Sequence, residues 1–159
     1  RRRPRDAAVA TTYLESTMAV VSKASTQWNG ELFSGSGNTT LETSKQGTFD
    51  VSWKSRGEGE TTSTTPEELI ASAHATCYAM QFSVMLAENG TPPTQLNTAA
   101  AVTFVPGTGI TGIELTVRGK VDGIDKDAFT DLATKAKEQC PVSQALAGTT
   151  ITLGTVELS

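Results

Sequence analysis

The spacing of apolar residues divides the chain into one long helix and several short strands. After position 65, apolar or small residues recur at steps of four, four, three and four, which form one stripe of an α-helix: Leu69, Ala73, Cys77, Met80 and Val84. Thr65 suits the N-cap, Pro66 the first helical position and Glu68 the closing position of a capping box. An Asn-Gly pair follows Glu88 and ends the helix. The pattern predicts a helix with Cys77 on its packed face.

Alternating apolar and polar residues predict strands on both sides of this helix. The strand-like runs are 24–28, 48–53, 97–105, 109–121 and 149–158. The first two belong to an expected N-terminal antiparallel meander, with turns at Asn29-Gly30 and at positions 35–38. This order of elements predicts an α+β fold in a single domain that spans residues 18–159.

A second helix is predicted after Asp125, which suits its N-cap. Its apolar stripe continues one turn later to the second cysteine and contains Phe129, Leu132, Ala133, Ala136 and Cys140. Both cysteines are therefore expected to project into the layer between the two helices. A disulfide between them would require this arrangement.

The residue after Cys140 is proline, which suits the first position of a new short helix. Cys140 would then lie at the N-cap, where backbone N–H groups favour a thiolate. Cys77 on a packed face is either a small core residue or a nucleophile in a dry pocket. Because the chain contains one histidine, a tetrahedral metal site would need carboxylates or a second subunit. Two cysteines in unlike helical settings favour a redox pair over a metal site.

Composition narrows the classes of partner and compartment. Apolar content of 37% and aromatic content of 6% are low for a monomer, which favours a dimer, and the net charge of −4 argues against nucleic acid or an anionic membrane. No membrane-length apolar run or signal-peptide pattern is expected, so we predict a cytosolic protein with reduced thiols. Residues 1–17 carry four of the thirteen basic residues, and we expect a flexible extension, vector-derived or upstream of the fold.

Two motifs resemble those of a known family. The first runs from Pro66-Glu67-Glu68-Leu69-Ile70 to Ala73-His74-Ala75-Thr76-Cys77, and the second is Cys140-Pro141-Val142-Ser143-Gln144-Ala145-Leu146. In order and spacing they resemble the OsmC/Ohr family of thiol-dependent peroxidases, and specifically its OsmC branch. The resemblance covers the chain from about residue 24 to its C-terminus.

The resemblance implies an intertwined homodimer of antiparallel sheets packed around a long central helix that carries one cysteine. It implies reduction of organic hydroperoxides, and less efficiently of hydrogen peroxide, in defence against oxidative or osmotic stress and with no metal or flavin cofactor. Cys77 matches the peroxidatic position and Cys140 the resolving one. An arginine in the loop before the helix and a glutamate at the helix start fall on Arg56 and Glu67.

Thiol chemistry suggests a role in peroxide reduction for each of these four residues. A buried Cys77 needs a nearby cation to be a thiolate, and Arg56 is the candidate, held in place by Glu67. Attack on a peroxide gives a sulfenic acid, Cys140 condenses with it, and an external dithiol, of the lipoyl type or another thiol, reduces the disulfide. An apolar pocket lined by residues such as Met80 and Leu69 would favour alkyl or lipid hydroperoxides.

Helix geometry separates two of these residues. Ten residues place the Cα atoms of Glu67 and Cys77 about 15 Å apart along the axis, with side chains about 80° apart. Either an arginine bridges this gap or the Arg-Glu pair comes from a second chain with an antiparallel helix. We expect the active site to be completed at a two-fold dimer interface.

Other interpretations stay open at this point. His74, three residues before Cys77, could act as a base or in positioning, although a hydrogen-bonded core histidine is favoured. A non-enzymatic domain with a structural Cys77–Cys140 disulfide and a metal- or ligand-binding module are the alternative functions.

Overall fold

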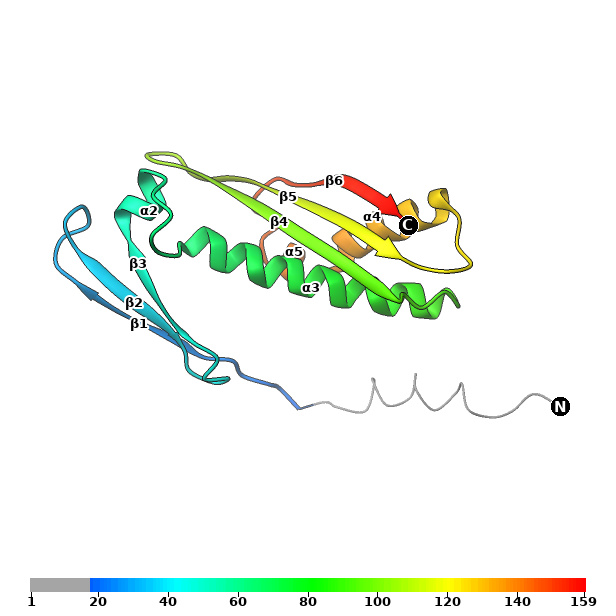
Figure 1. Ribbon diagram of the computed structural model, residues 1–159, viewed down its shortest axis with the longest axis horizontal. Helices are drawn as coiled ribbons and strands as arrows, with labels where there is room; N and C mark the ends of the chain where they lie inside the picture. The colour runs from blue at the N-terminus through cyan, green and yellow to red at the C-terminus, as the bar shows by residue number, and fades with distance from the viewer. Residues whose placement is uncertain (1–17) are drawn as a thin grey trace.

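The computed structural model describes residues 18–159, so the prediction for residues 1–17 lies outside the described part (Figure 1). The predicted helices and strands are present, including the short helix after Cys140, together with one strand, β2, and one short helix, α2, that were not predicted. The elements are β1 (Ala24–Asn29), β2 (Ser36–Leu41), β3 (Thr48–Ser52), α2 (Trp53–Gly57), α3 (Pro66–Glu88), β4 (Gln95–Val105), β5 (Gly109–Lys120), α4 (Lys126–Gln139), α5 (Pro141–Ala145) and β6 (Ile151–Leu158). The predicted α+β class is confirmed.

The N-terminal sheet is an antiparallel meander in the order β1-β2-β3, as predicted. The turn predicted at positions 35–38 is wrong, because β2 begins at Ser36 and the chain reverses just before it. Gly37 serves a close approach within the sheet. A Cβ there would lie 2.2 Å from the carbonyl oxygen of Gln27 and 3.1 Å from the Trp28 ring. The glycine at position 37, which suggested a turn, is therefore explained by the crowding between neighbouring strands.

The second sheet has the order β4-β5-β6 and is not wholly antiparallel. β4 and β5 form an antiparallel hairpin, whereas β6 pairs with β5 in parallel, which corrects the prediction of antiparallel sheets. The physical reason is the connection. The chain crosses from β5 through α4 and α5 before it returns to the sheet, and a crossover of that length permits parallel pairing.

Helix α3 begins as predicted, because the Thr65 side chain accepts a hydrogen bond from the Glu68 N–H at 3.0 Å. Its predicted packed stripe is only partly correct, because Cys77 and Val84 pack against the core but two other members do not. Met80 is 68% exposed and Ala73 is also exposed, while Cys77 is only half-buried. The buried residues of α3 are Glu67, His74, Tyr78, Phe82, Met85 and Leu86. The larger aromatic rings occupy the core, whereas Cys77 and Val84 of the predicted stripe lie half-buried at its edge and Ala73 and Met80 face outward.

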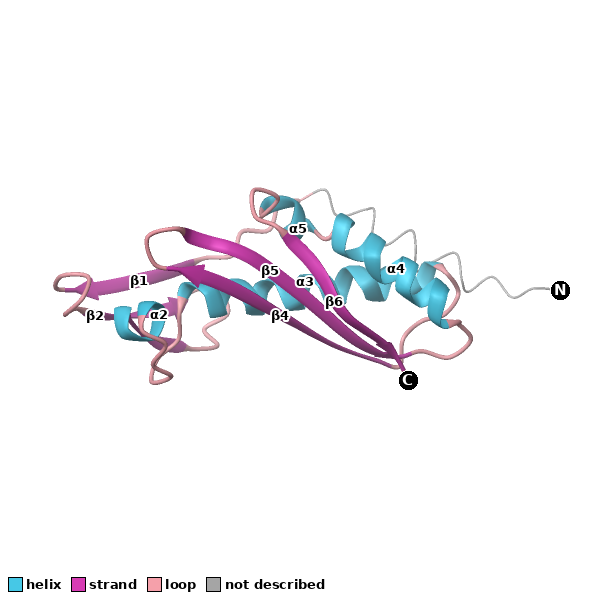
Figure 2. Ribbon diagram, turned by 90° about the horizontal axis from the view of Figure 1, so that it is seen from above, coloured by secondary structure: helices cyan, strands magenta, loops and turns pink. Residues whose placement is uncertain are grey.

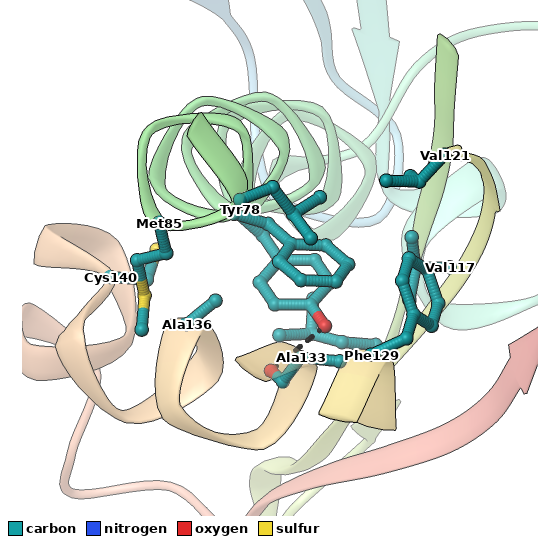
Figure 3. Packing of buried hydrophobic residues seen from close by; sticks show 11 residues of the cluster. Tyr78, Met85, Val117, Val121, Phe129, Ala133, Ala136 and Cys140 are labelled. Carbon is teal, nitrogen blue, oxygen red and sulfur yellow. Dashed lines mark hydrogen bonds between the residues drawn. The ribbon is translucent and has the colours of Figure 1, made fainter. Parts of the chain in front are cut away.

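The core lies between α3, α4 and the sheet of β4, β5 and β6 (Figures 2 and 3). The ring of Phe82 lies 6.0 Å from that of Tyr78 and 5.0 Å from that of Phe129, centroid to centroid. The Tyr78 hydroxyl donates to the Ala133 carbonyl at 3.0 Å and so joins α3 to α4. Each buried ring of this kind contributes about 3–5 kcal/mol, judged by the cost of truncation to alanine. The core therefore holds α3 against the middle of α4.

Only one of the two sheets packs on α3 within the chain, contrary to the prediction. The sheet of β1, β2 and β3 extends away from the helix and is joined to the rest through α2 (Figure 1). Every residue of β1 is exposed, and Phe33 in the following turn is 69% exposed. A sheet normally buries one of its faces against a second layer. Within residues 18–159 of one chain, this second layer is absent.

Helix α3 is long and apolar enough, by length and composition alone, to cross a membrane. This differs from the expectation that no segment approaches such a length. The helix carries two buried polar side chains, Glu67 and His74, and both are hydrogen-bonded to other parts of the fold. These contacts are those of a central helix in a packed domain.

Candidate active site

The two cysteines come together between α3 and the junction of α4 and α5. Cys77 lies in the middle of α3 and is half-buried, whereas Cys140 is fully buried and is both the C-cap of α4 and the N-cap of α5. Both are free thiols, and the Cys140 thiol lies close enough to Cys77 to raise its pKa. The prediction that both project into the layer between the helices is confirmed.

The environment of Cys77 favours the thiol form. Burial raises the pKa of Cys77, the backbone N–H of Val142 lowers it, and the neighbouring Cys140 raises it again. The N–H group at the start of α5 thus serves Cys77 and not Cys140, which makes no side-chain cap hydrogen bond. This corrects the predicted role of the α5 terminus. A thiolate at Cys77 requires a positive charge that its own surroundings do not supply.

Arg56 and Glu67 form a hydrogen-bonded ion pair at the start of α3. The Arg56 Nη2 donates to Glu67 Oε1 at 2.8 Å, and Nε donates to the same oxygen at 3.0 Å and to Oε2 at 3.3 Å. The Glu67 side chain is 8% exposed and that of Arg56 is 34% exposed. The predicted pairing is confirmed, but Arg56 lies in the short helix α2 and not in a loop. Its backbone is therefore fixed as well as its guanidinium.

An aromatic ring completes the setting of Arg56. The guanidinium carbon lies 4.4 Å from the centre of the Phe104 ring, a cation–π contact with the end of β4. Phe104 also meets the Trp53 ring edge to face at 6.3 Å, and Trp53 meets Phe33 in the same way at 5.4 Å. Sequence reasoning missed Phe104, because nothing in a strand of alternating residues marks a ring that lies against an arginine.

The cysteine pair and the Arg56–Glu67 pair do not meet within one chain. Glu67 and Cys77 both belong to α3, and the ten residues between them span about 15 Å of helix. The buried carboxylate anchors the guanidinium at the start of the helix. The alternative in which Arg56 bridges to Cys77 of its own chain is therefore not observed. Completion of the site by a second chain stays a prediction.

A largely apolar hollow of about 460 Å³ lies beside Arg56. Its apolar lining residues include Trp28, Leu32, Val51, Trp53 and Leu69. Met80 lines a different hollow, together with Val84 and Leu96. The prediction of one pocket lined by both Leu69 and Met80 is wrong for the single chain, because the two residues lie on different parts of a long helix.

His74 is a hydrogen-bonded core histidine, as favoured from the sequence. Its Nε2 lies 2.7 Å from the Ser143 Oγ of α5, and both side chains are buried. Burial lowers the pKa of His74, so the imidazole is held neutral. Its Nδ1 has no hydrogen-bond partner. Sequence reasoning did not identify Ser143 as the partner, since the two residues are far apart in the chain.

No three His, Cys, Asp or Glu side chains converge as a metal site would require, among the residues that the structure describes. The groups that do converge are two thiols, with a buried hydrogen-bonded imidazole beside them, and separately an ion pair over an aromatic ring. Thiol redox chemistry is the chemistry that these groups can perform.

The sequence matches the family model of OsmC-like proteins over residues 57–154. This span contains Glu67, Cys77 and Cys140 and begins directly after Arg56. Among curated relatives, the peroxiredoxin OsmC of Escherichia coli (strain K12) is 39% identical over 132 residues, which cover 81% of this chain and 92% of the relative. The peroxiredoxin OsmC of Shigella flexneri matches to the same extent.

Solved structures share the fold. An OsmC-like protein from Mycoplasma pneumoniae has a TM-score of 0.67 at 14% identity and covers 89% of this chain and 99% of its own. An organic hydroperoxide resistance protein from Legionella pneumophila has a TM-score of 0.64 at 20% identity, with 87% and 99% covered. One from Bacillus subtilis has a TM-score of 0.59 at 21% identity, with 86% and 98% covered.

Proposed function

The chain belongs to the family of OsmC-like proteins and is a peroxidase, and we propose that it reduces organic hydroperoxides with Cys77 as the peroxidatic thiol and Cys140 as the resolving thiol. The observation that carries the proposal is the proximity of two free thiols that lie far apart in sequence: Cys77 packs against the core cluster that contains Cys140, and the Cys140 thiol raises the pKa of Cys77. Cys77 is the more exposed of the two and the one that a substrate can reach. Cys140 is buried directly behind it.

The reaction has two steps. The Cys77 thiolate attacks one peroxide oxygen, an S–O bond forms as the O–O bond breaks, and the alkoxide leaves as the alcohol after it takes up a proton. Cys140 then attacks the sulfenic sulfur, an S–S bond forms as the S–O bond breaks, and the oxygen leaves with the thiol proton as water. An external dithiol reduces the Cys77–Cys140 disulfide and becomes a disulfide itself.

The first step needs the cation that Arg56 supplies. Because burial raises the pKa of Cys77, few thiolates would form without it. A guanidinium remains charged at all relevant pH values and can contact both the sulfur and a peroxide oxygen. Glu67 and Phe104 leave part of Arg56 exposed for such contacts.

The substrate class follows from the surface beside Arg56. The hollow that contains Arg56 is lined mainly by apolar groups, including two tryptophans, Trp28 and Trp53. An alkyl or aryl hydroperoxide would bury its hydrocarbon part there, with its peroxide group near the guanidinium. Hydrogen peroxide offers no apolar group to bury, so we expect it to be a weaker substrate.

The proposal includes a homodimer, because one chain leaves large apolar side chains uncovered. Trp28, Leu32, Phe33, Phe49 and Met80 are between 38% and 69% exposed. The first four belong to the sheet that lacks a second layer or to the turn between β1 and β2, and Met80 is an exposed residue of α3. A second copy of the chain that covers both would bury a surface of the kind found in permanent dimers.

The dimer would also complete the active site. If two α3 helices cross antiparallel about a two-fold axis, Glu67 of one chain lies beside Cys77 of the other when the axis passes midway between them, at Ser72 and next to Ala73. The partner's Arg56 and its apolar hollow then meet the cysteine pair. The outward stripe of α3 lies on this contact.

The first experiment is oxidation of fully reduced protein with one equivalent of cumene hydroperoxide, followed by thiol titration and mass spectrometry. Wild type should lose two thiols and gain a Cys77–Cys140 bond. Cys140→Ser should accumulate a sulfenic acid that dimedone traps, and Cys77→Ser should not react. If both thiols survive in wild type, the peroxidase mechanism is wrong, and a structural disulfide domain or a binding module becomes the better interpretation.

A mixing experiment tests whether Arg56 acts across the interface. Arg56→Ala and Cys77→Ser homodimers should each be nearly inactive. When the two variants are unfolded and refolded together, half of the dimers are mixed and each mixed dimer holds one complete site, so about a quarter of wild-type activity should return. No recovery would mean that Arg56 serves the cysteine of its own chain.

A dithiol of the lipoyl type and a cytosolic location belong to the same proposal. Two free thiols persist in a reducing compartment and form a disulfide there only transiently. Comparison of dihydrolipoamide, reduced thioredoxin and glutathione as electron donors in steady-state turnover identifies the reductant class.

A further inference from the structure

Helix α5, which begins at Cys140, cannot hold its own position. It has five residues and no side-chain cap at its N-terminus. One turn of helix is not stable by itself, so tertiary contacts must fix it. Val142 packs partly against the core, and the remaining fixed point is Ser143, which is buried.

Ser143 is tied to α3 by the hydrogen bond to His74. Within residues 18–159, this is the side-chain hydrogen bond that joins α3 to α5. Its N···O distance is 2.7 Å. His74 is fully buried and Ser143 is 6% exposed. A hydrogen bond shielded from water in this way is maintained more strictly than one on the surface.

The bond runs beside the two sulfurs. On α3, His74 precedes Cys77 by three residues, and at α5 Ser143 follows Cys140 by three residues. Residues three apart lie on the same face of a helix, about 4.5 Å along the axis. The imidazole and the hydroxyl therefore join the two backbones about one helical turn away from the sulfurs.

We propose that His74 and Ser143 position the resolving cysteine: their hydrogen bond holds α5 against α3 so that Cys140 can close the disulfide with Cys77. The inference rests on the two-cysteine mechanism proposed above. Disulfide formation requires the two Cα atoms to lie about 4.4–6.8 Å apart, so a small movement of α5 would prevent it.

A role in packing alone does not account for a histidine at this position. Its Nδ1 is buried without a partner, which has a free-energy cost that an apolar side chain of similar size would avoid. An apolar residue would fill the same space but could not tie α5 to α3. The hydrogen bond is what His74 adds.

Loss of the bond has a chemical consequence. When closure is slow, the Cys77 sulfenic acid survives long enough to meet a second peroxide. The sulfenic sulfur then takes one further oxygen from that peroxide, which leaves as an alcohol, and Cys77 becomes a sulfinic acid. Positioning by His74 and Ser143 therefore protects the enzyme from overoxidation.

The test separates the two chemical steps in a single turnover. Reduced protein is mixed with cumene hydroperoxide, quenched with an alkylating reagent at intervals, and the free thiol at each cysteine is quantified by mass spectrometry. In Ser143→Ala and His74→Leu, we expect loss of the Cys140 thiol to slow about fivefold or more, while loss of the Cys77 thiol changes by less than about twofold. The sulfinic acid yield should rise with excess peroxide. His74→Gln, whose amide Nε2 can still donate, should close more quickly than His74→Leu.

Tyr78→Phe is the matched control. It removes a buried hydrogen bond of 3.0 Å from the same helix, one residue from Cys77, but that bond leads to α4 and not to α5. In Tyr78→Phe, the ratio between the rate of Cys140 thiol loss and the rate of Cys77 thiol loss should stay at the wild-type value. If Tyr78→Phe slows closure as much as Ser143→Ala, or if Ser143→Ala closes at the wild-type rate, the positioning role is wrong.

A second experiment measures disulfide closure by Cys140 without peroxide. Cys77 is first converted to a mixed disulfide with 5,5′-dithiobis(2-nitrobenzoic acid), and closure by Cys140 releases one coloured thiol, whose absorbance gives the rate. Ser143→Ala should release it more slowly than Tyr78→Phe. If peroxide does not oxidise wild type but this difference is observed, the peroxidase mechanism fails and the positioning of Cys140 stands. Equal rates overturn the positioning role whatever the peroxide arm shows.

Discussion

The guanidinium of Arg56 is held from two sides, by the buried carboxylate of Glu67 at 2.8 Å and by the face of the Phe104 ring at 4.4 Å. The two contacts come from different elements, α3 and β4. The cation that we propose for the peroxidatic thiol is thus placed before any substrate binds, which lowers the cost of ordering it during the reaction.

Glu67→Gln should lower kcat/KM for cumene hydroperoxide by about tenfold, because the amide keeps the shape of the carboxylate but weakens the charge-assisted hydrogen bonds to Arg56. Steady-state kinetics with a dithiol reductant measure the change. Glu68→Gln is the control, since Glu68 is exposed and contacts Thr64, not Arg56. Equal effects of the two substitutions would argue against a role for the ion pair.

Phe104→Leu should lower kcat/KM by about two- to fivefold, because a cation–π contact of about 0.5–1 kcal/mol is lost while most of the apolar volume is kept. Phe33→Leu serves for comparison: it alters the same group of aromatic rings through Trp53 without touching Arg56. Rate measurements with cumene hydroperoxide and hydrogen peroxide should show a loss for Phe104→Leu with both substrates. A larger loss for Phe33→Leu would mean that the apolar hollow, and not the position of Arg56, is affected.

Ala73→Cys tests the proposed dimer axis. In a Cys77→Ser/Cys140→Ser background, a cysteine at position 73 should cross-link the two chains on mild oxidation, since residues on a two-fold axis lie opposite their own copies. Non-reducing electrophoresis measures the yield. Glu88→Cys, at the far end of α3, should give little cross-linked product. If the two variants cross-link equally, the axis does not pass near Ala73.

The stability of the protein should decrease as the pH falls below about 6.5. Burial lowers the pKa of His74, while in the unfolded chain the imidazole keeps its ordinary value of 6.5. The unfolded state therefore binds the proton first, so this contribution to stability is complete above pH 6.5 and is lost as the pH falls. Urea unfolding at about pH 8 and about pH 5.5, at one protein concentration, measures the loss.

His74→Gln isolates the effect, because His74 is the only histidine in the sequence. The variant should be less dependent on pH across this range, even if its stability at about pH 8 is lower. The same loss between the two pH values in wild type and His74→Gln would show that other groups are responsible.

Local patterns predicted much of the fold and part of the candidate site. Helix caps act between neighbouring residues, and both Thr65 and Asp125 accept the predicted hydrogen bonds. Helix geometry also required the separation of Glu67 from Cys77, since rise per residue does not depend on the rest of the protein. The buried face of α3 was predicted wrongly because Cys77 and its neighbours in the stripe are apolar, as are Tyr78 and Phe82. Periodicity could not decide which side meets the sheet.

The sequence by itself determined where most of the helices and strands lie and that two cysteines occupy separate helical settings, while only the family resemblance marked Arg56 and Glu67 as candidates to serve one of them. These features depend on local backbone geometry and on the chemistry of residue types. The tertiary structure alone decided that β6 runs parallel to β5, that the Val142 N–H faces Cys77, that Phe104 lies on Arg56 and that His74 binds Ser143. Each of these contacts joins residues distant in the chain, and which ones meet is set by how the whole core packs.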